Sequence, residues 1–362
     1  MLGNHQAALN CYEQYYLEAS SGEQAVDALS LLANQFNNMG RYEEALKASQ
    51  EGLDLTAALN YTQGRAAAFQ NLGRSYAHQG RQEEAVSRLQ KALALFEQIG
   101  NKREISRTCN WLGIVMLDQG HVDNAIQYFQ RALMLADHIS DIQKATVLSN
   151  LGECHQILFD THQAILYHRQ ALALAKEIQL SSLEADLLRN LGVDLADNGE
   201  IEEGAACLEE VLRLSTETGQ QDIKLQTLAS LAQVELARQN ISQALHYAEI
   251  MKAEAIEIKA RHFEADALYV LGLCYQFQGQ PVAAEQTWHT ALFRAHETNQ
   301  QGLLWRIHAG LAEVVGNKAL ADTHYRIAAE VIDQIVYPIE NENLRNTFLN
   351  APPIKKIMEA AV

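Results

Sequence analysis

Arginine and amide side chains recur along this chain, and their functional groups are suited to holding a ligand. Arg74, Arg107 and Arg189 each carry a planar guanidinium, which binds a carboxylate or a phosphate through paired hydrogen bonds. Asparagine and glutamine amides pair with the backbone of an extended peptide, because each offers donors and an acceptor. The further candidates are Asn34, Asn37, Asn38, Gln70, Asn110, Glu153, Gln233, Tyr269 and Phe277. These residue types predict non-covalent binding rather than catalysis.

Each candidate also has a plainer interpretation. A polar residue on a helix can simply face solvent, and the arginines can pair with Glu153 or Asp186 of the same chain. Tyr269 and Phe277 are either anchors for a ligand or ordinary packing residues. The sequence leaves these alternatives open.

Motifs of catalytic chemistry are absent from the sequence. It contains no GxxxxGK[ST] phosphate loop, no GxGxxG and no HExxH. His155 and His162 lie seven residues apart with Cys154 beside the first, but scattered helix residues show the same spacing. No serine stands in the context of a nucleophile elbow. We therefore expect no enzymatic activity, no metal and no cofactor.

The composition predicts a helical protein with a protein or peptide partner. Apolar residues make up 48% of the 362, and only one of the 4 prolines, Pro281, precedes residue 338. The net charge of -17, from 28 basic and 45 acidic side chains, argues against nucleic acid. No run of 18 apolar residues suggests a membrane span, and the opening MLGNHQAALN does not resemble a signal peptide. The five cysteines form no CxxC pair, so we expect reduced thiols and a cytoplasmic location.

An internal repeat of 39 or 40 residues runs through the chain. Its anchor is a leucine followed by glycine or alanine, at Leu32, Leu72, Leu112, Leu151, Leu191, Leu231, Leu271 and Leu311. Eight residues later comes glycine in five copies, at Gly40, Gly80, Gly120, Gly199 and Gly279. Small alanines follow thirteen and twenty residues after the anchor, as at Ala85 and Ala92. Eight aligned copies indicate a stack of similar units.

Each mark has a physical role in a pair of helices. The glycine after the anchor allows a neighbouring helix to approach closely, and the later glycine ends the first helix. The second helix then restarts with acidic residues in its first turn, as in RYEEAL and RQEEAV. The two alanines are seven residues apart, so they lie on one face and permit tight packing. The unit is therefore helix, short turn, helix.

This pattern resembles the tetratricopeptide repeat, with its Leu-Gly, aromatic, Ala and Ala positions. The aromatic position, four residues after the anchor, is filled by Phe36, Tyr76 and Tyr275. The resemblance implies an all-α fold, a right-handed superhelical solenoid of antiparallel helix pairs, with about eight repeats plus an N-terminal half repeat. The period of 40 rather than 34, and the missing closing proline, suggest longer helices. Such helices occur in kinesin light chains, Pins-type polarity adaptors and bacterial signalling ATPases.

The candidate residues all fall on one face of the first helix of a repeat. At about 100° per residue, offsets −5, −2, +2, +5 and +6 from the anchor lie opposite the apolar face. In the resembling family this face lines the concave inside, where a peptide or partner protein lies. Leu236, Leu273 and Phe277 occupy the same offsets, so we expect an inside that is polar first and more apolar toward the C-terminus.

The two ends differ from the repeats. The first residues match the second helix of a unit, with Ala8 aligned to Ala45, so the array of residues 1–337 opens on a half repeat. Residues 338–362 follow as a capping segment that can shield the last apolar face. Their phrase LRNTFLNAP resembles the tail of repeat arrays in large bacterial regulators. A binding scaffold is thus the first functional hypothesis, and the ligand-sensing arm of a larger bacterial signalling NTPase is the alternative.

Overall fold

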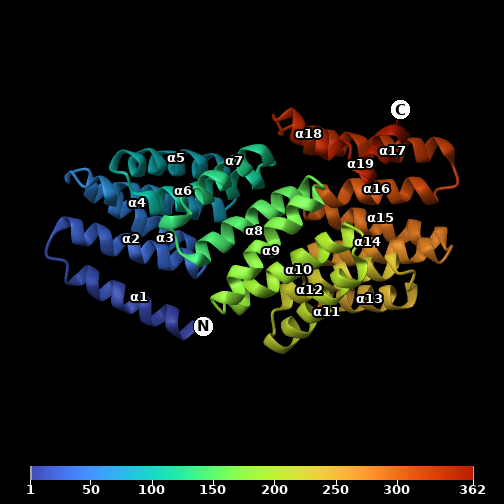
Figure 1. Cartoon of the computed structure of the whole chain (residues 1–362), viewed down its shortest axis with the longest axis horizontal. Helices are drawn as coiled ribbons and strands as arrows, with labels where there is room; N and C mark the ends of the chain where they lie inside the picture. Colours follow the sequence, from blue (N-terminus) through green and yellow to red (C-terminus); the bar gives the residue numbers. More distant parts are fainter. Residues whose placement is uncertain (1, 362) are drawn as a thin grey trace. The chain divides into compact units, whose positions relative to one another are not determined.

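The computed structural model describes residues 2–361, and Met1 and Val362 lie outside that range. The described chain is helical throughout, with nineteen α-helices, one 3-10 turn and no strand (Figure 1). Consecutive helices pack against one another as a solenoid of helix pairs, as the repeat predicted. Clustering of contacts divides the chain into two compact units, Met1–Val147 and Leu148–Val362, and the division falls within α8.

The first unit holds the helices as far as α7 and the first part of α8. Their bounds are α1 Leu2–Leu17, α2 Gly22–Asn38, α3 Tyr42–Thr56, α4 Thr62–His78, α5 Gln82–Ile99, α6 Lys102–Asp118, α7 Val122–Leu133, the 3-10 turn Ala136–His138 and α8 Asp141–Ile157. The second helices begin as expected, because Glu43 and Glu44 occupy the first turn of α3 and Glu83 and Glu84 that of α5.

The second unit holds the rest of α8 and all later helices. Their bounds are α9 Thr161–Glu177, α10 Ser181–Asp197, α11 Ile201–Thr218, α12 Gln221–Ala237, α13 Ile241–Glu257, α14 Arg261–Phe277, α15 Pro281–Glu297, α16 Gln301–Val314, α17 Lys318–Val336, α18 Glu342–Leu349 and α19 Pro352–Ala360. Most repeat helices have 17 residues, which explains the 40-residue period. The last repeat is shorter than the others, because α16 has only 14 residues.

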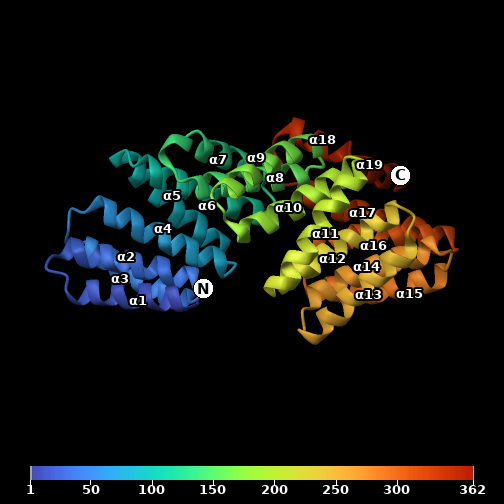
Figure 2. The same ribbon diagram turned by 60° about the horizontal axis from the view of Figure 1, so that its bottom comes forward.

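Even-numbered helices form a layer of their own within each unit. In the first unit α2 contacts α4 and α4 contacts α6; in the second, α10, α12, α14 and α16 contact one another in turn. Two even-numbered helices are separated in sequence by one odd-numbered helix. They touch each other because the array of each unit curves toward them, so the even-numbered helices lie on its inner side. We call this layer the inner layer, and Figure 2 shows the same helices from a second direction.

The packing of the helices confirms the role predicted for the small residues that recur in each repeat. A Cβ placed on Gly73 would lie 2.6 Å from Cγ of Leu89, so only glycine lets α5 approach α4 this closely. The alanines thirteen and twenty residues after the anchor, such as Ala85 and Ala92, are completely buried. Gly80 has a φ of 73° and begins the turn after α4, in the left-handed region that favours glycine.

Candidate functional site

The inner layer of the first unit carries a chain of polar side chains that joins successive helices. Arg74 of α4 donates from Nη2 to Oδ1 of Asn38 at 3.1 Å and from Nη1 to Oδ1 of Asn34, both on α2. Its guanidinium carbon lies 4.7 Å from the ring centroid of Trp111 on α6. Three helices therefore meet at one arginine. Trp111 was not among the sequence candidates, although its position one residue before an anchor leucine places it beside them.

Arg74 is a buried cation whose hydrogen-bond partners are neutral amides. Only 7% of its surface is exposed, and no carboxylate of the described residues lies within 4.0 Å of it. Burial, reinforced by the nearby positive charge of Arg107 and opposed by the charge of Glu104, lowers the pKa of Arg74 to about 10. The side chain is still charged at neutral pH, and its Nε finds no hydrogen-bond partner. This site consequently favours an added negative charge.

Arg107 is the accessible member of this group. Its side chain is 40% exposed and lies 3.5 Å from Glu104, one turn earlier on α6. An exposed pair at this distance contributes little to stability, so the guanidinium can exchange partners. Arg107 and Arg74 thus form a positive pair with one open member.

Other predicted residues of the first unit bond to neighbouring helices. Gln70 donates to Oγ1 of Thr108 at 2.8 Å and to Oε2 of Glu104 at 3.2 Å, linking α4 to α6. Asn37 accepts from the hydroxyl of Ser75 at 2.8 Å, linking α2 to α4. These two amides and Asn110 are buried. The polar offsets therefore serve the interior of the array, and ligand contact by these three amides stays a prediction.

Asn71, which comes one residue before the anchor Leu72, bonds to a neighbouring helix. Its amide donates to the backbone oxygen of Ser30 at 3.0 Å, and the side chain is buried. An amide one residue before the anchor therefore satisfies a backbone oxygen of the neighbouring helix α2. In the second unit Asn190 stands at the matching place and donates to Oε1 of Glu153 at 3.5 Å.

A second cluster lies on α8 and α10, at the start of the second unit. Burial lowers the pKa of Arg189, while the charges of Asp186 and Glu153 oppose that change. Burial likewise raises the pKa of Glu153 and of Asp186, and Arg189 acts against both shifts. The three groups share one electrostatic environment, yet no hydrogen bond joins the guanidinium to either carboxylate within the described part of the chain, and Nε of Arg189 is buried without a partner. The predicted pairing is therefore one of charge rather than of direct bonds.

Charged residues also gather on the inner layer further along the second unit. Burial raises the pKa of Asp266 to about 6, and Arg306 of α16 opposes that rise. Arg306 also opposes the burial-driven rise in the pKa of Asp197 on α10 and of Tyr269 on α14. Gln300 donates to both carboxylate oxygens of Asp266 at 3.3 Å. Arg306 escaped the sequence analysis, although it lies at offset −5 from Leu311 and the face pattern would have found it.

The expectation of a more apolar inside toward the C-terminus is wrong for Leu236. It is buried in a core cluster with Ala232 and Leu271, so it stabilises the helix stack instead of lining a surface. Leu273 packs against the same cluster but is only partly buried. Phe277, in contrast, is 55% exposed, and Gln233 is exposed with only a bond to its own helix. Tyr269 is partly buried against the cluster of Leu236.

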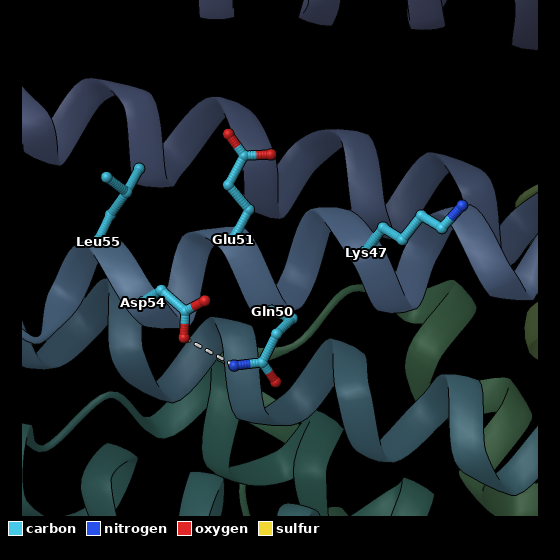
Figure 3. A pocket seen from close by; sticks show the side chains of 5 residues that line it. All are labelled: Lys47, Gln50, Glu51, Asp54 and Leu55. Atoms are coloured by element: carbon cyan, nitrogen blue, oxygen red, sulfur yellow. Dashed lines mark hydrogen bonds between the residues drawn. The ribbon is translucent and has the colours of Figure 1, made fainter.

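An open depression on the first unit has no part in these clusters. It has a volume of about 510 Å³ and is lined by five residues of α3, among them Lys47, Glu51 and Leu55. Figure 3 shows Gln50 and Asp54 on a different side of the helix, joined by a hydrogen bond of 2.8 Å. The lining is mostly charged and none of the predicted residues belongs to it, so it supports no binding site by itself.

Two further features bear on the class of protein. Within residues 2–361, no three histidine, cysteine or acidic side chains converge in a way that could hold a metal ion. None of the helices in that range is both long enough and apolar enough to cross a bilayer. Cys109, Cys154 and Cys274 are buried and free, as small packing residues.

Comparisons with known proteins agree on the repeat. A tetratricopeptide-repeat model matches residues 24–98 and 104–177, and a second such model matches residues 265–290. No curated protein matches the sequence. Within these three stretches the family models coincide with the period and the helix packing.

Solved structures share the fold at low sequence identity. A Rap protein complexed with Competence and Sporulation Factor is 13% identical, with a TM-score of 0.69 over 94% of this chain and 99% of that one. The apo form of RapI is 17% identical, with a TM-score of 0.65 over 75% of this chain and 98% of that one. BtubC from P. vanneervenii is 19% identical, with a TM-score of 0.50 over 60% of this chain and 90% of that one. At these identities the likeness concerns the fold, and the family models together with the repeat marks identify tetratricopeptide repeats in this chain.

Proposed function

We propose that this chain is a protein-interaction module that holds a peptide, free or within a partner protein, on its inner layer. The proposal rests on the polar residues of the even-numbered helices, which present donors, acceptors and charges along one face. Inner faces of helical solenoids offer extended surfaces of this kind. Catalysis has no comparable support among the described residues.

Arg74 is the observation that carries the proposal. Its charge is buried among amides and beside the Trp111 ring, with no carboxylate within 4.0 Å in the described structure. Burial of a cation that has no direct carboxylate partner is unfavourable, and a carboxylate arriving from outside would relieve it. Arg107 and Asn38 are exposed enough to contact such a group. We therefore assign the first unit a ligand that carries a carboxylate, from an acidic side chain or a C-terminus.

The solved relatives support a role in binding. One Rap protein with this fold is complexed with Competence and Sporulation Factor, and its similarity extends over 94% of the present chain. An array of this length can therefore accommodate a bound factor. The residues that would make such contacts here are those of this chain, because the identity of 13% carries no residue correspondence.

The test uses the full chain and a library of short peptides. Each peptide with a free C-terminal carboxylate is paired with its C-terminal amide, and peptides with Asp or Glu are paired with Asn or Gln. A charge-assisted hydrogen bond contributes about 1.5–3 kcal/mol, so neutral members should bind roughly 10-fold to 100-fold more weakly. The variant Arg107→Gln should lose the same preference, whereas Arg88→Gln, which removes one charge from the odd-numbered helix α5, should keep it.

The same library can contradict the proposal. Equal binding of acidic and neutral members, or equal losses in Arg107→Gln and Arg88→Gln, would remove the inner arginines from recognition. Arg107 is preferred to Arg74 as the first variant because its exposed side chain can be changed without opening the buried layer. Arg189→Gln applies the same comparison to the second unit.

A further inference from the structure

Two turns between paired helices depart from the repeat pattern, because a residue other than glycine occupies their left-handed position. The place eight residues after the anchor has positive φ in every turn from Gly40 to Gly279, and glycine fills most of them. Phe159, between α8 and α9, adopts a φ of 57° at the matching place, and Gln239 adopts 61°. A bulky residue in the left-handed region costs free energy, because its Cβ approaches the following carbonyl oxygen. A compensating contact is therefore expected at Phe159.

Phe159 contacts the segment that follows the repeats. Its ring centroid lies 5.7 Å from that of Phe348 on α18, with the planes tilted by 55°. Phe348 is only 3% exposed. This geometry lies in the favourable range for aromatic pairs. Phe159, the bulkier of the two residues that replace glycine at this place, thus contacts the C-terminal segment.

The other half of the C-terminal segment is fixed on the last repeat. Ile354 and Ile357 of α19 are buried, and α19 packs against α17. Lys356 forms an ion pair with Glu313 of α16, which also accepts a hydrogen bond from Gln276 of α14 at 2.8 Å. The segment of residues 338–362 therefore has two attachments within the second unit, one at α16 and α17 and one at the turn after α8.

Charges on helices far apart in the sequence also act on one another inside this unit. Arg306 of α16 acts electrostatically on Asp197 of α10, although three repeats separate them along the chain. In a simple solenoid each repeat contacts only its neighbours, so the spacing across several repeats is soft. A covalent segment that joins two distant repeats would fix that spacing.

We propose that residues 338–362 are an intramolecular strap, which ties the turn at Phe159 to the end of the array. The strap sets the distance between α8 and α16, and with it the width of the inner layer on which Asp197, Asp266 and Arg306 lie. A cap that only covers the last apolar helix would need no contact with α8. The inference concerns the conformation of the second unit and does not depend on any ligand.

The test is amide hydrogen exchange, measured by mass spectrometry on the full chain. Phe348→Ala removes the contact from one side, and Phe159→Gly removes it from the other while relieving the backbone. Both variants should accelerate exchange about 10-fold in α18 and, in addition, in the turn 158–160 and the first turn of α9. Gln239→Gly is the matched control, because it relieves the same backbone conformation in the turn between α12 and α13 and leaves the contact of Phe159 with Phe348 in place. Its exchange in α18 should equal that of the natural chain.

Two results would overturn the strap. Acceleration by Phe348→Ala that is confined to α17–α19 would show a local cap. An effect of Gln239→Gly on α18 as large as that of Phe159→Gly would show that backbone strain, not the aromatic contact, controls this segment. Circular dichroism confirms that each variant keeps its helix content, and Phe159→Gly, located in a turn, keeps the test informative if Phe348→Ala does not fold.

Discussion

A polar pair replaces an apolar contact in the core of the second unit, and its removal is predicted to be costly. The residue that packs on the glycine after the anchor is Leu89, Phe129, Leu208 or Trp288 in other repeats, but His168 in the fourth. His168 is fully buried, and its Nδ1 lies 2.5 Å from Oδ2 of Asp194 on the next inner helix, α10. One repeat later the corresponding pair is Leu208 and Val234, in one apolar cluster.

The expected magnitudes follow from burial. The side chain of Asp194 is 1% exposed and also accepts from Nε2 of Gln156 at 2.7 Å. Removing one partner of a buried hydrogen-bonded pair leaves the other without compensation, at a cost of about 3–5 kcal/mol. We expect His168→Leu and Asp194→Val each to lower the free energy of unfolding by roughly 3 kcal/mol. The double variant copies the pair Leu208 and Val234, so it should lie within about 1 kcal/mol of the natural chain or above it.

The assay is a double-mutant cycle by urea denaturation, with hydrogen exchange of α9 and α10 as a local measure. Exchange is included because repeat arrays can unfold in parts, so one midpoint need not describe the chain. The two single losses should exceed the double loss by several kcal/mol, which is the coupling of the pair. Additive losses in the double variant, or single losses below about 0.5 kcal/mol, would refute the reasoning.

Two further predictions concern pH, in addition to the peptide and exchange experiments above. Burial, and after it the nearby His324, lowers the pKa of His308 to about 4, so the contribution of this histidine to stability is complete above pH 6.5 and is lost as the pH falls toward 4. Chemical denaturation should show that the natural chain loses about 3 kcal/mol more over that interval than His308→Leu does. Parallel pH profiles of the two proteins would contradict this prediction. Burial raises the pKa of Asp266 to about 6, so the folded state loses stability as the pH rises through 6. Asp266→Asn should therefore raise the free energy of unfolding by up to about 3 kcal/mol at pH 7 and should have little effect at pH 4. A gain of equal size at pH 7 and at pH 4 would show that the charge of Asp266 is not the cause.

The helix pairs could be predicted because each depends on local rules that repeat. The positive φ at Gly80 and the close approach at Gly73 both require glycine, so the sequence records them directly. Buried alanines such as Ala85 mark the contact between helices in the same way. Repetition multiplied these weak signals into a reliable period of 40 residues.

The state of the inner layer was only partly predictable. Rotation by 100° per residue placed Asn37, Gln70 and Arg74 on one face, but could not show whether that face meets water or another helix. In the structure these side chains bond to an adjacent inner helix, Asn37 to α4, Gln70 to α6 and Arg74 to α2, and they become buried, because successive inner helices lie close enough for their polar groups to pair. The prediction that Leu236 lines the inside was wrong for the same reason. Leu236 shares its offset from the anchor with polar residues, but it packs into the core.

The sequence by itself determined the repeat, the helix pair and the family, because period and residue size encode contacts between neighbours. Tertiary structure alone decided the contacts between distant repeats. In the sequence Phe159 only replaces a glycine of the repeat, whereas the structure shows its ring against that of Phe348. In the sequence His168 could lie on the surface, whereas in the structure its Nδ1 lies 2.5 Å from Oδ2 of Asp194. Such pairs lie far apart in the chain, or on different helices, and no local rule of spacing constrains them. Their meaning depends on the curvature that brings the helices together.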